Sequence, residues 1–280
     1  MNDADQSLDF GQIFRQLAKE TSIDPEVLLN AMKKEDRSMP TLQLLATTIQ
    51  ELWAWFSSAL RRKESTIFGM REIAKYWKTH AFHQAKSALL LDKSGLADSS
   101  VANSRSSMEY GAYLSLLALS QDPRTDVVDK LAKKSLNRSK FSLDAISQDD
   151  SSELSLLSQM FSQLLEDDTP DPMRVHNFKS VCDRFENGET IYFYFHFLSS
   201  LIHPGINGTL MLLPDKVFLA SGINLKLTYR RISLKMAVGG CAWASWAANS
   251  LTDPDDFEER FGTIVREMGF VPLTLKNSTA

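Results

Sequence analysis

The sequence predicts an all-α protein: an up-and-down helical bundle with additional helices at its N- and C-terminal ends. Apolar residues recur at helical spacing across residues 41–119 and again across residues 227–250. Pro40 and Gly95 fall at the ends of periodic stretches, where helix boundaries are expected. Runs that could form strands are confined to residues 206–222, where a small hairpin is the alternative to a packed loop. The helical pattern therefore decides the fold class.

Composition and charge are ordinary for a globular protein. The chain has 280 residues, of which 43% are hydrophobic and 24% charged, which is enough to bury a large core. The net charge of −4 gives no overall attraction to nucleic acid or acidic membranes, although a local basic patch is compatible with it. No apolar run approaches the roughly 20 residues that span a bilayer, and the acidic N-terminus lacks the apolar core of a signal peptide. We therefore expect a cytoplasmic protein without a membrane partner, in which Cys182 and Cys241 are reduced, buried thiols.

Two parts of unequal size are expected. Residues 1–39 form an N-terminal helical appendage, and residues 40–280 form the bundle with its C-terminal helical extension. Within the appendage, residues 10–19 have one apolar face. Residues 24–26, Asp-Pro-Glu, provide the cap, the first-position proline and the first-turn acid of a second helix.

Three long helices follow the appendage. The first covers residues 41–60 and precedes a basic triplet whose charges suit the C-terminal end of a helix dipole. The second covers about residues 65–91 and closes at Gly95, which suits a left-handed cap. The third starts at Asp98 or Ser99 and continues to about residue 119.

The middle of the chain is less regular. Residues 121–152 are rich in Ser, Lys and Asp, and residues 153–165 are amphipathic. The acidic segment 166–172 lacks the ligand spacing of a calcium loop, so a solvated loop is expected there. A short helix is expected over residues 175–185.

The C-terminal part predicts two more helices. The first, residues 227–250, contains Gly239-Gly240, and each glycine weakens a helix by about 1 kcal/mol relative to Ala. A close crossing with another helix would explain this pair. The second helix covers residues 253–268, and residues 274–280 are expected to be a frayed tail.

The most aromatic stretch, residues 190–205, predicts a helix with a functional face. Tyr192, His196, Ser199 and His203 are spaced by four, three and four residues, which places them on one side of a helix. Pro204-Gly205 ends that helix. His203 would then lie in the last turn, where the helix dipole stabilises its protonated form.

Two charged residues interrupt the apolar stripe of the helix at residues 98–119. Arg105 and Glu109 are four residues apart, in line with Val101, Ala112 and Leu116. Burial of a charge costs several kcal/mol unless the charge is paired and hydrogen-bonded. One interpretation is a structural Arg–Glu pair that ties two helices together. The other is a polar constellation at the bottom of a cleft.

Several common enzyme motifs are missing from the sequence. It contains no P-loop, dinucleotide-binding glycine fingerprint, nucleophile elbow or His-Glu-x-x-His motif. His80 and His83, three residues apart, could form half of a metal site, but such paired histidines are more often just polar positions on a helix. We therefore expect neither a metal nor another cofactor.

Two segments of the sequence, residues 83–114 and 192–204, resemble segments of a known group of proteins. The first segment, HQAKSALLLDKSGLADSSVANSRSSMEYGAYL starting at His83, resembles the central helical hairpin of HEPN-like bacterial proteins. Within that superfamily the chain is most similar to the uncharacterised proteins called domain of unknown function 5677. That family has an Arg followed four residues later by Glu, and an aromatic helix that ends in Ser and then His-Pro. The matching positions here are Arg105, Glu109, Tyr192, Ser199, His203 and Pro204.

The resemblance implies an up-and-down bundle, often a homodimer, in a toxin or antiviral defence system with a protein partner from the same system. Many HEPN proteins cleave RNA with an Arg-x4–6-His motif, but the segment before His203 holds no Arg. Arg105 would then supply the cation that stabilises the phosphorane, and His203 the general acid or base. Tyr192 or Ser199 would orient the phosphate, Glu109 would hold Arg105, and His196 shares their face.

Two hypotheses therefore remain. The first is a metal-independent ribonuclease or another nucleic-acid-processing effector that binds RNA. The second is a non-catalytic helical binding module, in which Arg105, Glu109 and His203 form a buried network or a small-ligand pocket. They differ in whether Arg105 and His203 can reach one phosphate in an open cleft.

Overall fold

The structure, a computed structural model, describes residues 39–60, 70–120, 178–202, 224–251 and 257–276. The helices are α3 (Leu42–Leu60), α4 (Met70–Lys93), α5 (Ala97–Leu119), α8 (Phe178–Cys182), α9 (Gly188–Ile202), α11 (Leu225–Leu251) and α12 (Thr263–Glu267), preceded by the π-helical turn η2 (Glu258–Gly262). In this part of the chain there is no strand, and the predicted all-α class is confirmed. None of the helices described is long and apolar enough to cross a membrane.

Several predicted features lie outside the described residues. They are the N-terminal appendage, the basic triplet at 61–63, the segments between 121 and 177, the alternative hairpin at 206–222, and His203 with the Pro204-Gly205 stop. The structure therefore bears on the bundle and on the aromatic helix up to Ile202.

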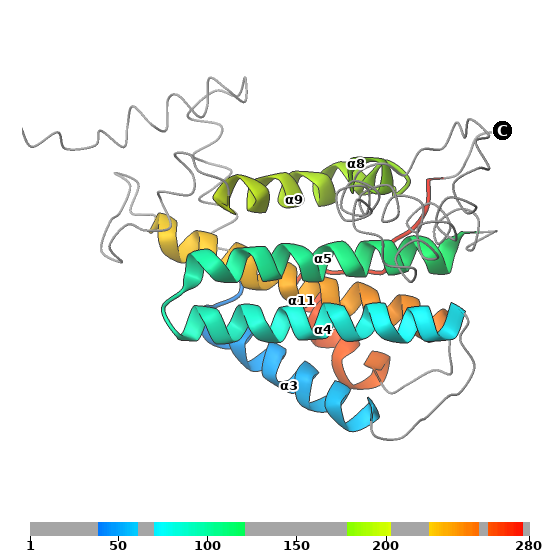
Figure 1. The fold of residues 1–280 in the computed structure, drawn as a ribbon, viewed down its shortest axis with the longest axis horizontal. Coiled ribbons are helices and arrows are strands. Elements are labelled where there is room, and N and C mark those ends of the chain that lie inside the picture. Colours follow the sequence, from blue (N-terminus) through cyan, green and yellow to red (C-terminus); the bar gives the residue numbers. More distant parts are fainter. Residues whose placement is uncertain (1–38, 61–69, 121–177, 203–223, 252–256, 277–280) are drawn as a thin grey trace, which may run out of the picture.

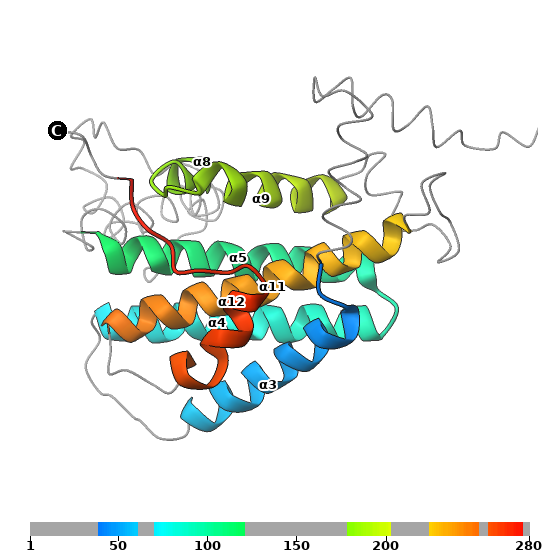
Figure 2. The same cartoon turned by 180° about the vertical axis from the view of Figure 1, so that it is seen from behind.

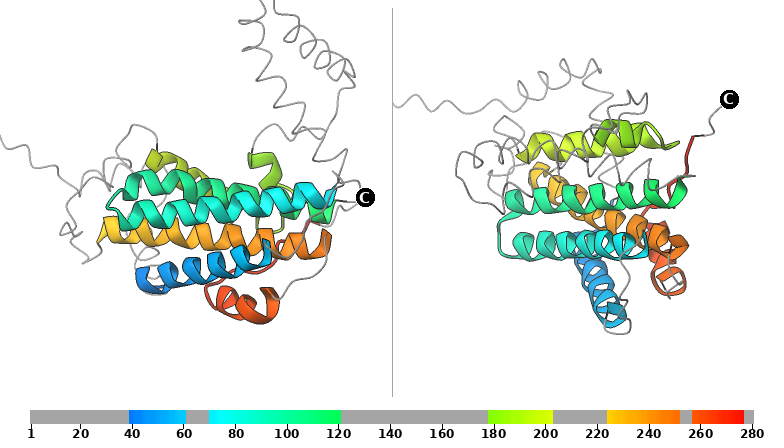
Figure 3. Two further views of the ribbon diagram at one scale, coloured as in Figure 1. Left: turned by 60° about the horizontal axis from the view of Figure 1, so that its bottom comes forward. Right: turned by 45° about the vertical axis from the view of Figure 1, so that its right-hand side comes forward.

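Three long helices form the centre of the molecule (Figure 1). α4 and α5 are an antiparallel hairpin closed at Gly95, whose φ of 79° is the predicted left-handed cap. α11 packs against both helices and runs parallel to α5. α8 and α9 lie over α5 on one side of this centre, while α3, η2 and α12 lie on the other (Figures 1 and 2). In the left view of Figure 3 α3 lies beneath α11, and in the right view it lies beneath α4.

The crossing of α5 and α11 is unusually close. A Cβ on Gly240 would lie 2.4 Å from the backbone carbonyl of Ser107, and one on Gly111 would lie 2.5 Å from the carbonyl oxygen of Gly240. The close crossing predicted from Gly239-Gly240 is therefore confirmed. Gly239 has a different neighbour, because a Cβ there would meet the ring of Phe270 at 2.3 Å.

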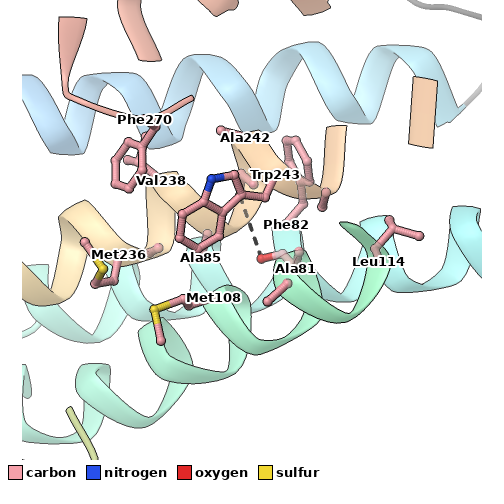
Figure 4. Close-up of a cluster of buried hydrophobic side chains, with 14 of the residues drawn as sticks. Ala81, Phe82, Ala85, Met108, Leu114, Met236, Val238, Ala242, Trp243 and Phe270 are labelled. Carbon is pink, nitrogen blue, oxygen red and sulfur yellow. Dashed lines mark hydrogen bonds between the residues drawn. The ribbon is translucent and has the colours of Figure 1, made fainter. Parts of the chain in front are cut away.

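Serine residues line this crossing. The Ser107 hydroxyl lies 2.9 Å from the carbonyl oxygen of Ala81 on α4 and 3.2 Å from that of Ala237 on α11. The Ser233 hydroxyl donates to Ser104 Oγ at 2.9 Å. Small side chains allow the helices to approach, and these hydrogen bonds satisfy the polar groups that the approach buries. Buried apolar residues of the same three helices pack together, among them Ala81, Met108 and Ala242, which Figure 4 shows.

The second layer beneath the centre is aromatic. Phe56 of α3 stacks on Phe82 of α4 with ring centres 4.4 Å apart. Trp55 contacts Phe257 and Phe261 at 5.4 and 5.6 Å, which joins α3 to the region around η2. Aromatic burial of this kind accounts for the position of α3 on the bundle.

Three boundaries differ from the sequence predictions. α5 begins at Ala97 with Leu96 as its cap residue, so neither Asp98 nor Ser99 is the start. The C-terminal helix is split, because residues 258–262 form a π-helical turn before α12. The predicted frayed tail is wrong for Thr274–Lys276, whose backbone pairs with the segment between α8 and α9.

Candidate functional site

The candidate site is the seam between α5 and α9, which run antiparallel. α9 starts just after a tight corner that follows α8. Gly188 packs so closely on this corner that a Cβ there would lie 1.7 Å from the carbonyl oxygen of Cys182. α9 buries Ile191, Leu198 and Leu201 and leaves its polar residues toward the rim and the solvent. This placement brings the predicted aromatic helix next to the predicted Arg–Glu helix.

Arg105 is the central residue of the seam. It is half-buried, and its guanidinium carbon lies 4.2 Å above the centre of the Phe195 ring. Its Nε is buried without a hydrogen-bond partner. A buried donor without an acceptor is costly, so this atom calls for an explanation in terms of function or of an added ligand. The cation lies over an aromatic ring and retains one unused donor.

Glu109 is half-buried one turn further along α5. Burial, together with the negative charge of Glu109, raises the pKa of the neighbouring Tyr110 phenol. The Tyr110 ring in turn stacks on His80 of α4, with ring centres 4.9 Å apart and planes 11° apart. The acidic residue thus lies at the same seam as Arg105, with a protonated phenol beside it.

The three candidate residues of α9 that the structure describes have different surroundings. Tyr192 is half-buried, and its ring centre lies 6.3 Å from that of Phe195 and 6.2 Å from that of His196. His196 is exposed. The Ser199 hydroxyl donates to the carbonyl oxygen of Phe195 in its own helix at 2.7 Å, so its proton is already in use. Tyr192 and His196 are therefore better placed than Ser199 to donate to a ligand.

Two contributors to this site were not predicted. Phe195 supports Arg105, and Lys179 of α8 places its Nζ 5.9 Å from the centre of the Tyr192 ring. A hydrogen bond with Asp183, 2.8 Å long, raises the pKa of the Lys179 ammonium group. The available signal was spacing, since Phe195 is three residues after Tyr192 and four before Ser199. Phe195 carries no polar group, so spacing alone did not mark it as a site residue.

The half metal site suggested by His80 and His83 is not assembled in the described part of the chain. His80 stacks on Tyr110, whereas the His83 ring lies 5.2 Å from Trp53 of α3. No cluster of three or more His, Cys, Asp or Glu residues is found among the residues described. The candidate site is therefore composed of a guanidinium, aromatic rings, an imidazole and a carboxylate.

Comparison of the chain with models of known protein families, with curated proteins and with solved structures finds no match. The geometry of the α5–α9 seam itself defines the site. Its centre is Arg105 on Phe195, with Glu109 and Tyr192 beside that pair. Such an arrangement of a fixed cation and nearby hydroxyl and imidazole groups suits an anionic ligand.

Proposed function

We propose that this protein is a metal-independent ribonuclease, or a related nucleic-acid-processing effector, of a bacterial defence or toxin system. The seam between α5 and α9 is its phosphate-binding site. The observation that supports this proposal is the buried Nε of Arg105, which has no hydrogen-bond partner while the guanidinium is held on Phe195. A phosphate oxygen would accept from that atom once the seam between α5 and α9 opens, because the atom is sealed from solvent in this structure. The resemblance to HEPN proteins adds a homodimer to the proposal, and the sequence without a signal-peptide pattern or an apolar span adds a cytoplasmic location.

Arg105 is suited to hold a phosphate before any reaction begins. A guanidinium offers five donors in one plane and stacks readily on an aromatic ring. Contact with Phe195 limits the orientations that the group can adopt, so less entropy is lost when an anion binds. Glu109, one turn away, is the residue proposed to hold Arg105 in place. Tyr192 would orient the phosphate through its hydroxyl.

The proposed reaction needs an acid and a base but no metal. His203, which directly follows α9, would take the proton of a ribose 2′-hydroxyl as its oxygen attacks the adjacent phosphorus. The bond from phosphorus to the 5′-oxygen then breaks, and that oxygen takes up a proton. Arg105 would stabilise the charge of the phosphorane. His196 of α9 is the candidate for the acid.

A non-catalytic helical binding module is the second candidate. The Ser199 hydroxyl is satisfied by its own helix, and Arg105 packs on the Phe195 ring. Both contacts are what packing alone would require. In that case the seam would bind a small anion or a partner segment without cleaving it.

An RNA-cleavage assay with added chelator tests the first candidate. Wild-type protein is compared with His203→Ala and Arg105→Ala, and Lys93→Ala serves as the control because it removes an exposed cation in the last turn of α4, a helix outside the seam. Helicity and melting temperature are measured for each variant. We expect cleavage by the wild type and by Lys93→Ala, and loss in the other two variants without loss of fold.

The opposite result is also informative. Absence of cleavage by the wild type, with strong destabilisation of both Arg105→Ala and His203→Ala, would favour the binding module. Arg105→Lys refines the comparison, because it keeps the charge but loses the planar donors. A ribonuclease that needs the guanidinium geometry would remain impaired in Arg105→Lys.

A further inference from the structure

The described C-terminal segment, Gly269–Lys276, crosses the molecule and is called the C-terminal strap here. It begins after α12 with Gly269, whose φ of 85° reverses the chain direction. It then runs along the bundle to the corner between α8 and α9, and is drawn in red in Figures 1 and 2. The strap thus connects the helical centre to the layer that carries the candidate site.

One end of the strap is anchored by aromatic packing on α11. The Phe270 ring fills the space above Gly239 and meets Trp243 edge to face, with ring centres 5.7 Å apart. Figure 4 shows Phe270 beside Val238 and Trp243. The Trp243 indole N–H also donates to the carbonyl oxygen of Val271 at 3.0 Å. Phe270 and Trp243 are buried, and their contacts hold this end of the strap at one place on α11.

The other end is held at the α8–α9 corner by hydrogen bonds and by Leu275, which is partly buried against the core. The Glu186 N–H donates to the carbonyl oxygen of Thr274 at 3.0 Å, and the Lys276 N–H donates to that of Arg184 at 2.9 Å. The Thr274 hydroxyl donates to the Glu186 carboxylate at 2.7 Å. Thr274, Glu186 and Lys276 are all exposed. Hydrogen bonds open to water are the kind that break first in local opening.

The corner between α8 and α9 is packed so tightly against the start of α9 that the two should move together. The Gly188 N–H donates to the carbonyl oxygen of Phe185 at 3.0 Å, and Gly188 is packed against Cys182 without room for a side chain. Phe185, which lies directly opposite Leu275 of the strap, is fully buried. A movement of the corner would therefore be passed to α9 and to Phe195 below Arg105.

We propose that the C-terminal strap is a releasable clamp that holds α9 on α5 and so keeps Phe195 under Arg105. Its buried anchor on α11 stays in place, while its exposed hydrogen bonds at the corner open and close. The effect of the clamp on α9 is independent of the reaction. Its effect on catalysis rests on the proposed function.

Hydrogen exchange followed by mass spectrometry on the full chain tests the clamp. Lys276→Pro removes the N–H that bonds to Arg184, and Lys276→Ala is the matched control because it keeps that N–H and removes only the side chain. We expect the amides of α9 and of Glu186 to exchange about fivefold faster in Lys276→Pro, as loss of one such hydrogen bond implies. Lys276→Ala should exchange like the wild type, and α4 and α11 should be unchanged in both variants.

Three results would overturn the clamp. They are an unchanged rate of amide exchange in α9 of Lys276→Pro, a Glu186 amide that stays protected in that variant, and faster exchange in every helix at once. The last result would show that the strap is part of the core. RNA cleavage measured on the same samples separates the two proposals. If the wild type cleaves nothing, the proposed function fails, and the exchange of α9 still decides whether the strap is a clamp.

Discussion

Gly111 of α5 and Gly240 of α11 face each other at the centre of the bundle, and a Cβ on Gly111 would lie 2.5 Å from the carbonyl oxygen of Gly240. Neither residue can carry a side chain unless a helix moves. Because α11 also contacts α4, this single approach determines how three helices fit together. A larger side chain at this crossing is therefore expected to destabilise the bundle.

Gly240→Ala should destabilise the fold by about 1–3 kcal/mol, because its methyl group would overlap the backbone of Ser107 and force the helices apart. Chemical denaturation measures the change. Gly262→Ala is the matched control, since the nearest atom there is the flexible carboxylate of Glu258 and the change should be small. Equal effects at the two glycines would contradict the rigid crossing.

Arg105 and Phe195 should be energetically coupled by about 0.5–2 kcal/mol through their cation–π contact. A double-mutant cycle with Arg105→Ala and Phe195→Leu measures this coupling by denaturation. The cycle is needed because Phe195 also contacts Phe178, with ring centres 4.3 Å apart, and that contact must cancel. Additive single effects would show that the guanidinium is not held by the ring.

Asp92→Asn should lower the free energy of unfolding by about 2 kcal/mol. Arg230 binds both carboxylate oxygens of Asp92, at 2.8 and 3.0 Å, and so ties α4 to the start of α11. Loss of one partner of a buried pair costs about 3–5 kcal/mol, and the 25% exposure of the Arg230 side chain reduces that value. Asp98→Asn, at an exposed position, is the control and should have little effect.

Cys182 and Cys241 should be unreactive toward thiol reagents in the folded protein. Burial raises the pKa of both thiols to about 12, so the reactive thiolate is scarce at neutral pH. Mass spectrometry after brief alkylation at pH 8 should find no label, whereas the denatured chain should carry two. Fast labelling of either native thiol would show that the core around it opens.

The same raised pKa values give a pH dependence with a definite sign. Above the ordinary thiol pKa of 9.0 the unfolded chain loses these protons while the folded chain keeps them, so the stability from this source falls as pH rises. Below that pH the contribution is constant. A Cys241→Ser variant tests the sign, because its stability should fall less steeply between pH 9 and 11.

The long helices could be predicted from the sequence because hydrophobic periodicity is a local signal. The same is true of Gly95 as a cap, and of Gly239-Gly240 as a mark of close approach. The Ser104–Ser233 and Ser107 contacts could not be predicted, because a polar residue is indistinguishable from a surface residue until its partner helix is known. The strap could not be predicted either, because nothing in the sequence around Thr274 indicates its hydrogen bond to Glu186.

At the candidate site, the sequence located the two helices correctly but not the contact between them. Arg105 was selected as a charge in an apolar stripe, and the structure places it half-buried on Phe195. Phe195 has no polar group and lies in a helix rich in aromatic residues, so the sequence favoured Tyr192 and Ser199 as site residues. The charge within the apolar stripe of α5 identified Arg105. Phe195, which supports it, could be identified only from the packing of α5 on α9.

The strap also bears on how the protein is made. Thr274 and Glu186 are bonded to each other although they are 88 residues apart in the sequence. During synthesis, which proceeds from the N-terminus, the α8–α9 corner leaves the ribosome well before its partner does. Under the proposed clamp, the layer that carries the site is secured only after α11 and α12 have emerged. A ribosome-bound nascent chain would hold Arg105 and Phe195 in an unfinished arrangement until translation has passed the strap.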